Sequence, residues 1–214
     1  LFSERAFVIK AIIELDDISK KVKARNGGRI GKAFLEDAEY KKVFDFHYHS
    51  IKGFMEQYGY YDVFVISPNS GRIVMSGSLE NDFGTELTDS NSHLAKIWKR
   101  MKISKKMEIS DFEPYLASNN LPAMFIIEPV FDNGQYAGSV ALQISIEEMN
   151  AVMQDTSGLG KTGESYLVGS DKRMRSDSRL DPTNHSVVAS FKGSIEKNGV
   201  NTIAVEEALS GKKG

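Results

Sequence analysis

The chain has 214 residues, of which 41% are hydrophobic and 26% charged, and its formal net charge is -2. A globular chain of this length can bury a core without metal or disulfide crosslinks, and its nearly balanced charge gives no indication of a nucleic-acid surface. The absence of cysteine excludes disulfides, thiolate metal sites and cysteine nucleophiles.

Two helices are predicted at the start of the chain, because apolar residues recur there at spacings of three and four. The first covers residues 3–25, with Ser3 as a possible N-cap and Asn26-Gly27-Gly28 as a stop. The second covers residues 30–58 and ends at Gly59. No stretch approaches the roughly 20 apolar residues that span a bilayer, and the sequence begins without a signal-peptide pattern. Since it also begins at Leu1 and not Met, we expect a segment of a longer protein.

The hydrophobic period then changes from that of a helix to that of strands. A tight turn is predicted at Asp132-Asn133-Gly134, and short helices at about 93–101 and 146–154. The expected strands are 60–67, 72–76, 108–115, 123–131 and 136–146. This order predicts a five-stranded antiparallel sheet flanked by helices, an α+β fold.

A similar order begins again after residue 155. We expect a strand pair at 164–169 and 173–176, a polar loop, and a helix at about 202–209. The predicted organisation is therefore a long helical region (1–58), one complete PAS-like sheet module (59–154) and a second, partial module (155–214). The second copy stops early, at Gly214.

Motifs for catalysis or cofactors are weak. Residues 158–163 fit G-x-G-x-x-G, but a predicted helix precedes them and a strand follows, which reverses the dinucleotide-binding order. His47 and His49 would point about 200° apart on a helix and cannot easily share a metal. No serine elbow with a histidine base is found. We therefore expect no enzyme activity, no metal and no cofactor.

One strand face is a candidate ligand site. Alternation along 139–145 puts Val140, Leu142 and Ile144 on one side as core. Small and polar residues, including Gln143, lie on the other side as a cavity floor or as a face toward water. On the strand before Tyr115, Asp111 and Tyr115 fall on one face, while Phe125 would supply an apolar wall and Trp98 the rim. The predicted pocket is Trp98, Asp111, Tyr115, Phe125 and Gln143. Asp111 favours a ligand with a positive or hydrogen-donating group.

Several segments together resemble the double Cache sensor domains of bacterial transmembrane receptors. They are residues 59–66 with 71–74, 80–87, 114–123, and 163–171 with 174–179. The resemblance covers nearly the whole chain. It is strongest to chemotaxis receptors, while histidine kinases and diguanylate cyclases carry similar domains.

That resemblance implies a periplasmic or extracellular sensor between two inner-membrane helices. It implies a small-molecule ligand in the membrane-distal module and a homodimer in the full receptor, joined through the helix 3–25. The amino-acid-binding subgroup carries Arg-x-Trp-Tyr near the short helix and an Asp on the last strand. Here residues 93–100 read differently and Gln143 stands at the Asp position, which argues against an amino acid ligand. The alternative to a ligand sensor is a structural or protein-binding ectodomain.

Overall fold

The computed structural model describes residues 2–212, with side chains from residue 6 onward. The chain divides into two compact units. The first, here called the sheet unit, comprises the described residues up to Ser110 together with Tyr115–Asn119 and Met124–Ile144. The second, here called the C-terminal unit, comprises Asp111–Pro114, Asn120–Ala123 and the described residues from Ser145 on. The predicted division at 58 and 154 stays a prediction. Among the helices that the structure describes, none combines the length and apolarity needed to cross a bilayer.

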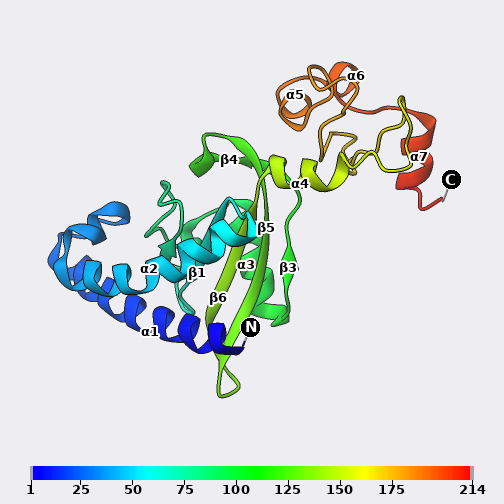
Figure 1. Ribbon diagram of the computed structural model, residues 1–214. Helices are drawn as coiled ribbons and strands as arrows, with labels where there is room; N and C mark the ends of the chain where they lie inside the picture. Colours follow the sequence, from blue (N-terminus) through cyan, green and yellow to red (C-terminus); the bar gives the residue numbers. More distant parts are fainter. Residues whose placement is uncertain (1, 213–214) are drawn as a thin grey trace. The chain divides into compact units, whose positions relative to one another are not determined.

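Two long helices open the sheet unit, α1 (Phe2–Arg25) and α2 (Ala38–Tyr58), with a 3-10 helix η1 (Gly31–Glu36) between them (Figure 1). Ser3 lies inside α1, so it is not the N-cap that the sequence predicted. The predicted helix 30–58 is interrupted because the Asp37 carboxylate accepts hydrogen bonds from the Glu39 and Tyr40 amides and starts a new helix. Gly59, with φ 77°, ends α2 as expected.

The sheet has six strands in the order β2-β1-β6-β5-β3, with β4 paired to β5. The strands are β1 (Asp62–Ile66), β2 (Ile73–Ser76), β3 (Glu108–Ile109), β4 (Glu113–Tyr115), β5 (Leu121–Asp132) and β6 (Gln135–Ile144). β1 pairs antiparallel with β2 and β6, and β5 pairs antiparallel with β3 and β6. The α+β fold predicted from the sequence is confirmed, with one more strand than expected.

The extra strand arises because the predicted strand 108–115 is divided. The Ser110 amide donates to the Phe125 carbonyl, and the Phe125 amide donates to Ser110 Oγ. After these bonds the chain leaves the ladder between β3 and β5, and a new strand, β4, begins only at Glu113. Asp111 therefore lies outside the strand alternation that was expected to align it with Tyr115.

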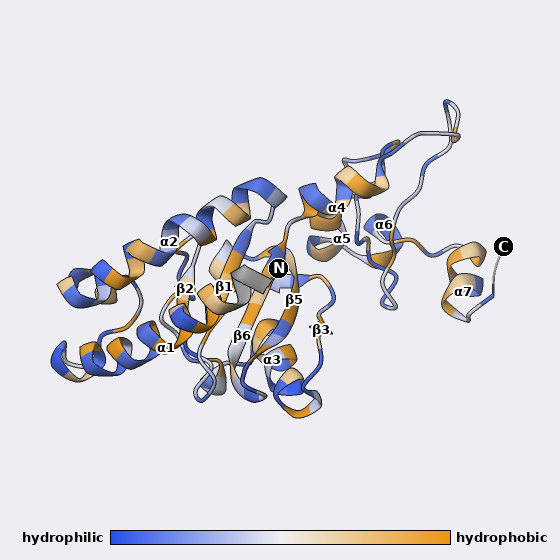
Figure 2. Ribbon diagram, turned by 60° about the horizontal axis from the view of Figure 1, so that its bottom comes forward, coloured by the Kyte–Doolittle hydropathy of each residue, from blue (hydrophilic) through white to orange (hydrophobic). Residues whose placement is uncertain are grey.

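Strand register defines two faces of the sheet. Asp62, Gln143 and Phe125 are direct neighbours on β1, β6 and β5, so their side chains share one face, the α3 face, named after α3 (His93–Ser104). Val63, Leu142 and Ile126 are the corresponding row of the opposite face, the α1/α2 face. Figure 2 shows hydrophobic residues along β1, β5 and β6. The main apolar core lies between this second face and the two helices, and includes Leu15, Phe44, Val65 and Phe83.

The β5–β6 hairpin closes as predicted. Asp132 pairs with Gln135, so Asn133 and Gly134 form a two-residue loop, and both have positive φ (47° and 78°). This geometry is the type I′ turn that asparagine and glycine favour.

The C-terminal unit is mostly irregular. It contains α4 (Ile146–Met153), α5 (Val187–Lys192), α6 (Ile195–Asn198) and α7 (Ile203–Leu209). The predicted strand pair at 164–169 and 173–176 is wrong in its extent, because pairing there is reduced to one bridge between Val168 and Met174. The Leu167 amide bonds to the Ser176 side chain instead of a backbone carbonyl, which ends the ladder. α7 agrees with the predicted helix at 202–209, while α5 and α6 were not expected.

Candidate functional site

A buried polar cluster lies on the α3 face, where the loop after β2 passes the end of the sheet. Its carboxylates come from β1 (Asp62) and from the loop (Glu80 and Asp82), and the side chains around them are Tyr61, Ser76, Ser78, Tyr115, Ser118 and Gln143. Each of the three carboxylates has a different set of hydrogen-bond donors, and this difference determines what each can do.

Asp62 is fully buried and saturated with donors. It accepts from Ser76 Oγ at 2.7 Å, from the Gly77 amide at 2.7 Å, from the Val63 amide at 2.6 Å, and from both the amide and the hydroxyl of Ser78. Burial raises the pKa of Asp62, and the bonds from Ser78 and Ser76 oppose that rise. These bonds tie β1 to the start of the loop, so Asp62 has a structural role.

Of the three carboxylates, Asp82 has the fewest hydrogen-bond donors. Its side chain is buried, Oδ2 accepts a hydrogen bond of 2.7 Å from the Tyr115 hydroxyl, and Oδ1 has no partner. Burial raises the pKa of Asp82 to about 7, and the negative charges of Asp62 and Glu80 add to the rise while the Tyr115 bond opposes it. Burial, together with the nearby Asp82 carboxylate, also raises the pKa of Tyr115.

Gln143 is the second residue with an unpartnered buried atom. Its Nε2 donates to Ser118 Oγ at 2.9 Å, and Ser118 Oγ donates to Glu80 Oε2 at 2.6 Å. Because the single Ser118 proton goes to Glu80, Ser118 can only accept from Gln143, which fixes the orientation of the amide. Gln143 Oε1 is therefore an acceptor, and it has no partner. Tyr61 donates to the other Glu80 oxygen at 2.7 Å, and this bond is the main reason that the pKa of Tyr61 rises to about 12.

Three of the predicted site residues meet here. The rings of Tyr115 and Phe125 lie 4.8 Å apart, and His93 packs against both, at 5.3 and 4.9 Å. Phe125 and Gln143 are direct neighbours across β5 and β6. Tyr115, Phe125 and Gln143 thus form one group on the α3 face, although ligand binding by them stays a prediction.

The other two predicted residues lie elsewhere. Trp98 is buried at 2% exposure and stands beside Tyr136 and Ser139, with the Lys102 ammonium 4.5 Å from its ring. Ser139 is four residues before Gln143, about 13 Å along the strand, so Trp98 belongs to another part of this face. Asp111 belongs to the C-terminal unit, where it forms a bidentate ion pair with Arg175. Arg175 Nε donates to Oδ1 at 2.6 Å and Nη2 to Oδ2 at 2.7 Å.

Sequence reasoning missed Glu80, Asp82 and Ser118. They lie on loops, where no periodicity indicates which way a side chain points. The one signal was the resemblance of segments 80–87 and 114–123 to Cache loops, which marked the segments but not these side chains.

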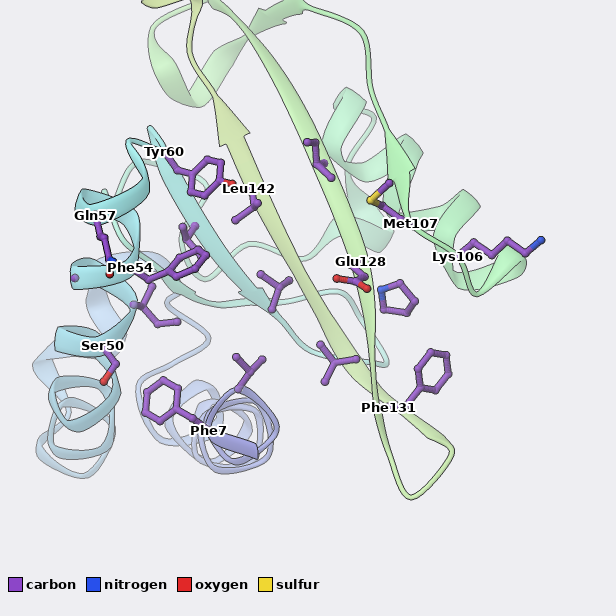
Figure 3. Close-up of a pocket in the computed structure, with 18 of the residues that line it drawn as sticks. Phe7, Ser50, Phe54, Gln57, Tyr60, Lys106, Met107, Glu128, Phe131 and Leu142 are labelled. Carbon is purple, nitrogen blue, oxygen red and sulfur yellow. The ribbon is translucent and has the colours of Figure 1, made fainter. Parts of the chain in front are cut away.

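The opposite face carries a groove of about 1170 Å³ between the helices and the sheet (Figure 3). Phe7, Phe54 and Tyr60 line one side and Val140 and Leu142 the other. In Figure 3, Glu128 lies among apolar residues on the sheet side, while Lys106 extends away from the groove. The groove is predominantly apolar and lacks the concentration of hydrogen-bonding groups found on the α3 face. Among the described residues, no group of three or more histidine and acidic side chains is arranged to hold a metal.

No protein-family model and no curated protein sequence matches the chain. Several solved structures, however, are similar to it in fold. The sensory domain of the Campylobacter jejuni chemoreceptor Tlp3 (CcmL) with isoleucine bound is 8% identical, with a TM-score of 0.51 over 97% of this chain and 78% of that chain. The extracellular domain of mmHK1S-Z2, a protein assigned as a histidine kinase, is 14% identical, with a TM-score of 0.50 over 98% and 82%. The ligand-binding domain of the Pseudomonas fluorescens chemoreceptor CtaA in complex with L-serine is 15% identical, with a TM-score of 0.45 over 81% and 71%. The first two similarities show that the chain has the fold of the sensory and extracellular domains of such receptors.

Proposed function

We propose that this chain is the extracytoplasmic ligand-sensing region of a bacterial transmembrane receptor of the double Cache type, most simply a chemotaxis receptor. The fold supports the class of protein. The mmHK1S-Z2 domain is about as similar in fold as the chemoreceptor domain, so the same proposal applies with a kinase output. A periplasmic location, membrane tethering by helices outside this segment and a homodimer through α1 belong to the proposal.

The small ligand is proposed to bind at the polar cluster on the α3 face. The observation that carries this proposal is the pair of buried acceptors, Asp82 Oδ1 and Gln143 Oε1, which belong to one cluster and have no partner. A buried polar atom without a partner costs about 1–3 kcal/mol. A small solute that donates hydrogen bonds to both atoms would recover this cost, and the Tyr115 and Phe125 rings would supply the apolar wall.

The loop that carries Asp82 offers a route from the site to the helices. The next residue, Phe83, is fully buried among the aromatic rings of the helices, with its ring centroid 5.6 Å from that of Phe44. Farther along, Glu86 accepts from Lys23 of α1 at 3.1 Å and from Arg72, which also donates to Ser19 of α1 at 2.6 Å. A ligand that favours one position of this loop would shift the population of helix positions, provided that it binds the two states with different affinity.

The test is a thermal-shift screen of amines, amino acids, carboxylates and purines, followed by calorimetry of any compound that stabilises the chain. A ligand at a hundred times its dissociation constant adds about 2.7 kcal/mol of stability. We expect Gln143→Ala to weaken its binding by about 1–3 kcal/mol, because a ligand donor loses its partner. Leu142→Ala is the matched control, since Leu142 is the adjacent residue on the opposite face. Weaker binding in Leu142→Ala with unchanged binding in Gln143→Ala would move the site to the groove.

A further inference from the structure

The three carboxylates of the polar cluster are not balanced by positive side chains. In the part of the chain that the structure describes, no lysine or arginine forms an ion pair with Asp62, Glu80 or Asp82. Asp62 is instead stabilised by five hydrogen-bond donors, and Glu80 by the hydroxyls of Tyr61 and Ser118. Asp82 has only the Tyr115 hydroxyl. A buried carboxylate with one donor and two negative neighbours must be neutralised, either by a proton or by a cation.

We infer that this site exchanges a proton for a compact ammonium ion, so that a primary amine without a neighbouring carboxylate is the ligand class and its binding releases the proton of Asp82. The inference rests on the proposed function. In the free protein the Asp82 carboxyl group holds the proton. When the protonated amine enters, the carboxyl O–H bond breaks, the proton leaves to solvent, and the ammonium N–H groups donate to Asp82 Oδ1 and Gln143 Oε1.

The chemistry of the cluster selects this ligand class. Gln143 Oε1 is an acceptor, and Asp82 Oδ1 is one once the carboxyl group is ionised, so the ligand that replaces the proton must be a donor. Three nearby carboxylates would repel the carboxylate of an α-amino acid, and the described residues offer no group arranged to coordinate a metal ion. The rings of Tyr115 and Phe125 pack against each other beside Asp82, and aromatic rings attract an ammonium group.

Several titratable groups face Asp82 from the elements around it. Asp62 comes from β1, Glu80 from the loop with Tyr61 bound to it, and Tyr115 from β4. His93 of α3 lies against the Tyr115 ring. Burial and the two carboxylates raise the pKa of Asp82 from its ordinary 3.8 to about 7. The folded state therefore binds one more proton than the unfolded state between those values, and the free energy of unfolding falls as the pH rises through this window.

The first experiment compares urea unfolding of the wild type and of Asp82→Asn from about pH 4 to about pH 8, with and without methylammonium chloride as the probe. Asp82→Asn keeps His93 and the other carboxylates, so the difference between the two proteins reports Asp82 together with its charge interaction with Asp62 and Glu80. We expect the wild type to lose stability relative to Asp82→Asn as the pH rises. Methylammonium should stabilise the wild type at about pH 8, much less at about pH 5 where the proton competes, and Asp82→Asn at neither.

Each contrary result would overturn a specific part of the inference. Parallel pH profiles of the two proteins would show that Asp82 holds no extra proton. Equal stabilisation by methylammonium at both pH values would show that the amine binds without proton exchange. A preserved pH difference with no effect of methylammonium would reject the amine as ligand class, while the proposed site would still stand or fall on the Gln143 and Leu142 comparison.

A second measurement needs no substitution and covers the case in which Asp82→Asn does not fold. In the wild type labelled with ¹³C at the aspartate carboxyl groups, NMR should show that the resonance assigned to Asp82 titrates near neutral pH. Methylammonium should move that titration to lower pH, since the cation stabilises the carboxylate. Titration of every aspartate below about pH 5 would overturn the inference.

Discussion

On β5 and β6, the two faces of the central sheet differ in a way that reverses a common expectation. The α1/α2 face carries Val140 and Leu142, yet both are only partly buried beside an open groove. The α3 face carries Ser139, Ala141 and Gln143, and all three are almost completely buried. The alternation of polarity along β6 therefore identified its two faces but did not reveal which face is more deeply buried. Burial of the polar face requires partners for its side chains. Asp82 Oδ1, Gln143 Oε1 and Ser139 Oγ have none, and the first two, which belong to one cluster, mark the candidate site.

The largest expected effect tests this difference in burial directly. Ile126 and Ile127 are adjacent on β5 and point to opposite faces, with Ile127 fully buried on the α3 face and Ile126 lining the groove. We expect Ile127→Ala to lower the free energy of unfolding by about 2–5 kcal/mol. Ile126→Ala should cost clearly less, since part of its side chain already contacts water. Urea denaturation measures both, and equal costs would contradict the inequality of the two faces.

A second effect concerns the polar interactions of the α3 face. Asp62→Ala removes the acceptor of five hydrogen bonds at the start of the loop. Each buried donor left unpaired costs about 1–3 kcal/mol, and hydroxyl groups that rotate to new partners reduce the total. Asp62→Asn keeps the shape and one acceptor oxygen, so it should retain more stability in thermal unfolding. If alanine and asparagine cost the same, the hydrogen bonds are not what holds the loop.

A third comparison separates close packing on this face from backbone strain. Gly71 and Gly134 both have positive φ, 66° and 78°. A Cβ on Gly71 would lie 2.7 Å from the Trp98 ring, whereas a Cβ on Gly134 would meet nothing within 4 Å. We expect Gly134→Ala to cost about 1–2 kcal/mol from conformation alone. Gly71→Ala should cost about 1–3 kcal/mol more, because the indole must move. Similar melting temperatures for the two variants would mean that Trp98 packs loosely.

The smallest effect is expected where the loop meets α1. The Lys23 ammonium is 3.1 Å from Glu86, and its side chain is 41% exposed. Lys23→Ala should change the free energy of unfolding by only about 0.2–1 kcal/mol, because solvent screens the pair and Glu86 keeps Arg72. Denaturation in low and high salt would check this, since the screened contribution shrinks as salt rises. A loss well above this range would indicate that the pair contributes more to the loop than its exposure implies.

Local chemistry was sufficient for much of the fold. The Asn133-Gly134 turn, the helix end at Gly59 and the alternation along β6 all depend on residues close together in the chain, and the structure confirms each of them. The interruption at Asp37 was missed although its cause is also local. Apolar periodicity continued through the 3-10 helix, and it outweighed the capping residue in the sequence interpretation.

The candidate site depended on contacts that no local pattern encodes. Tyr115 meets Asp82 and Gln143 meets Ser118 because the loop after β2 and the short 3-10 helix η3 (Leu116–Ser118) fold over the end of the sheet. The partners are 33 and 25 residues apart in the sequence. The sequence predicted Asp111 as a ligand-binding residue, but in the structure its carboxylate forms an ion pair with Arg175, which is 64 residues away. The sequence by itself determined the α+β class, the strand alternation and the turn chemistry, since short-range sterics and hydrogen bonding decide these features. Only the tertiary structure decided which face of β5 and β6 is buried more deeply and which carboxylate oxygen lacks a partner, because burial and pairing depend on the positions of distant segments.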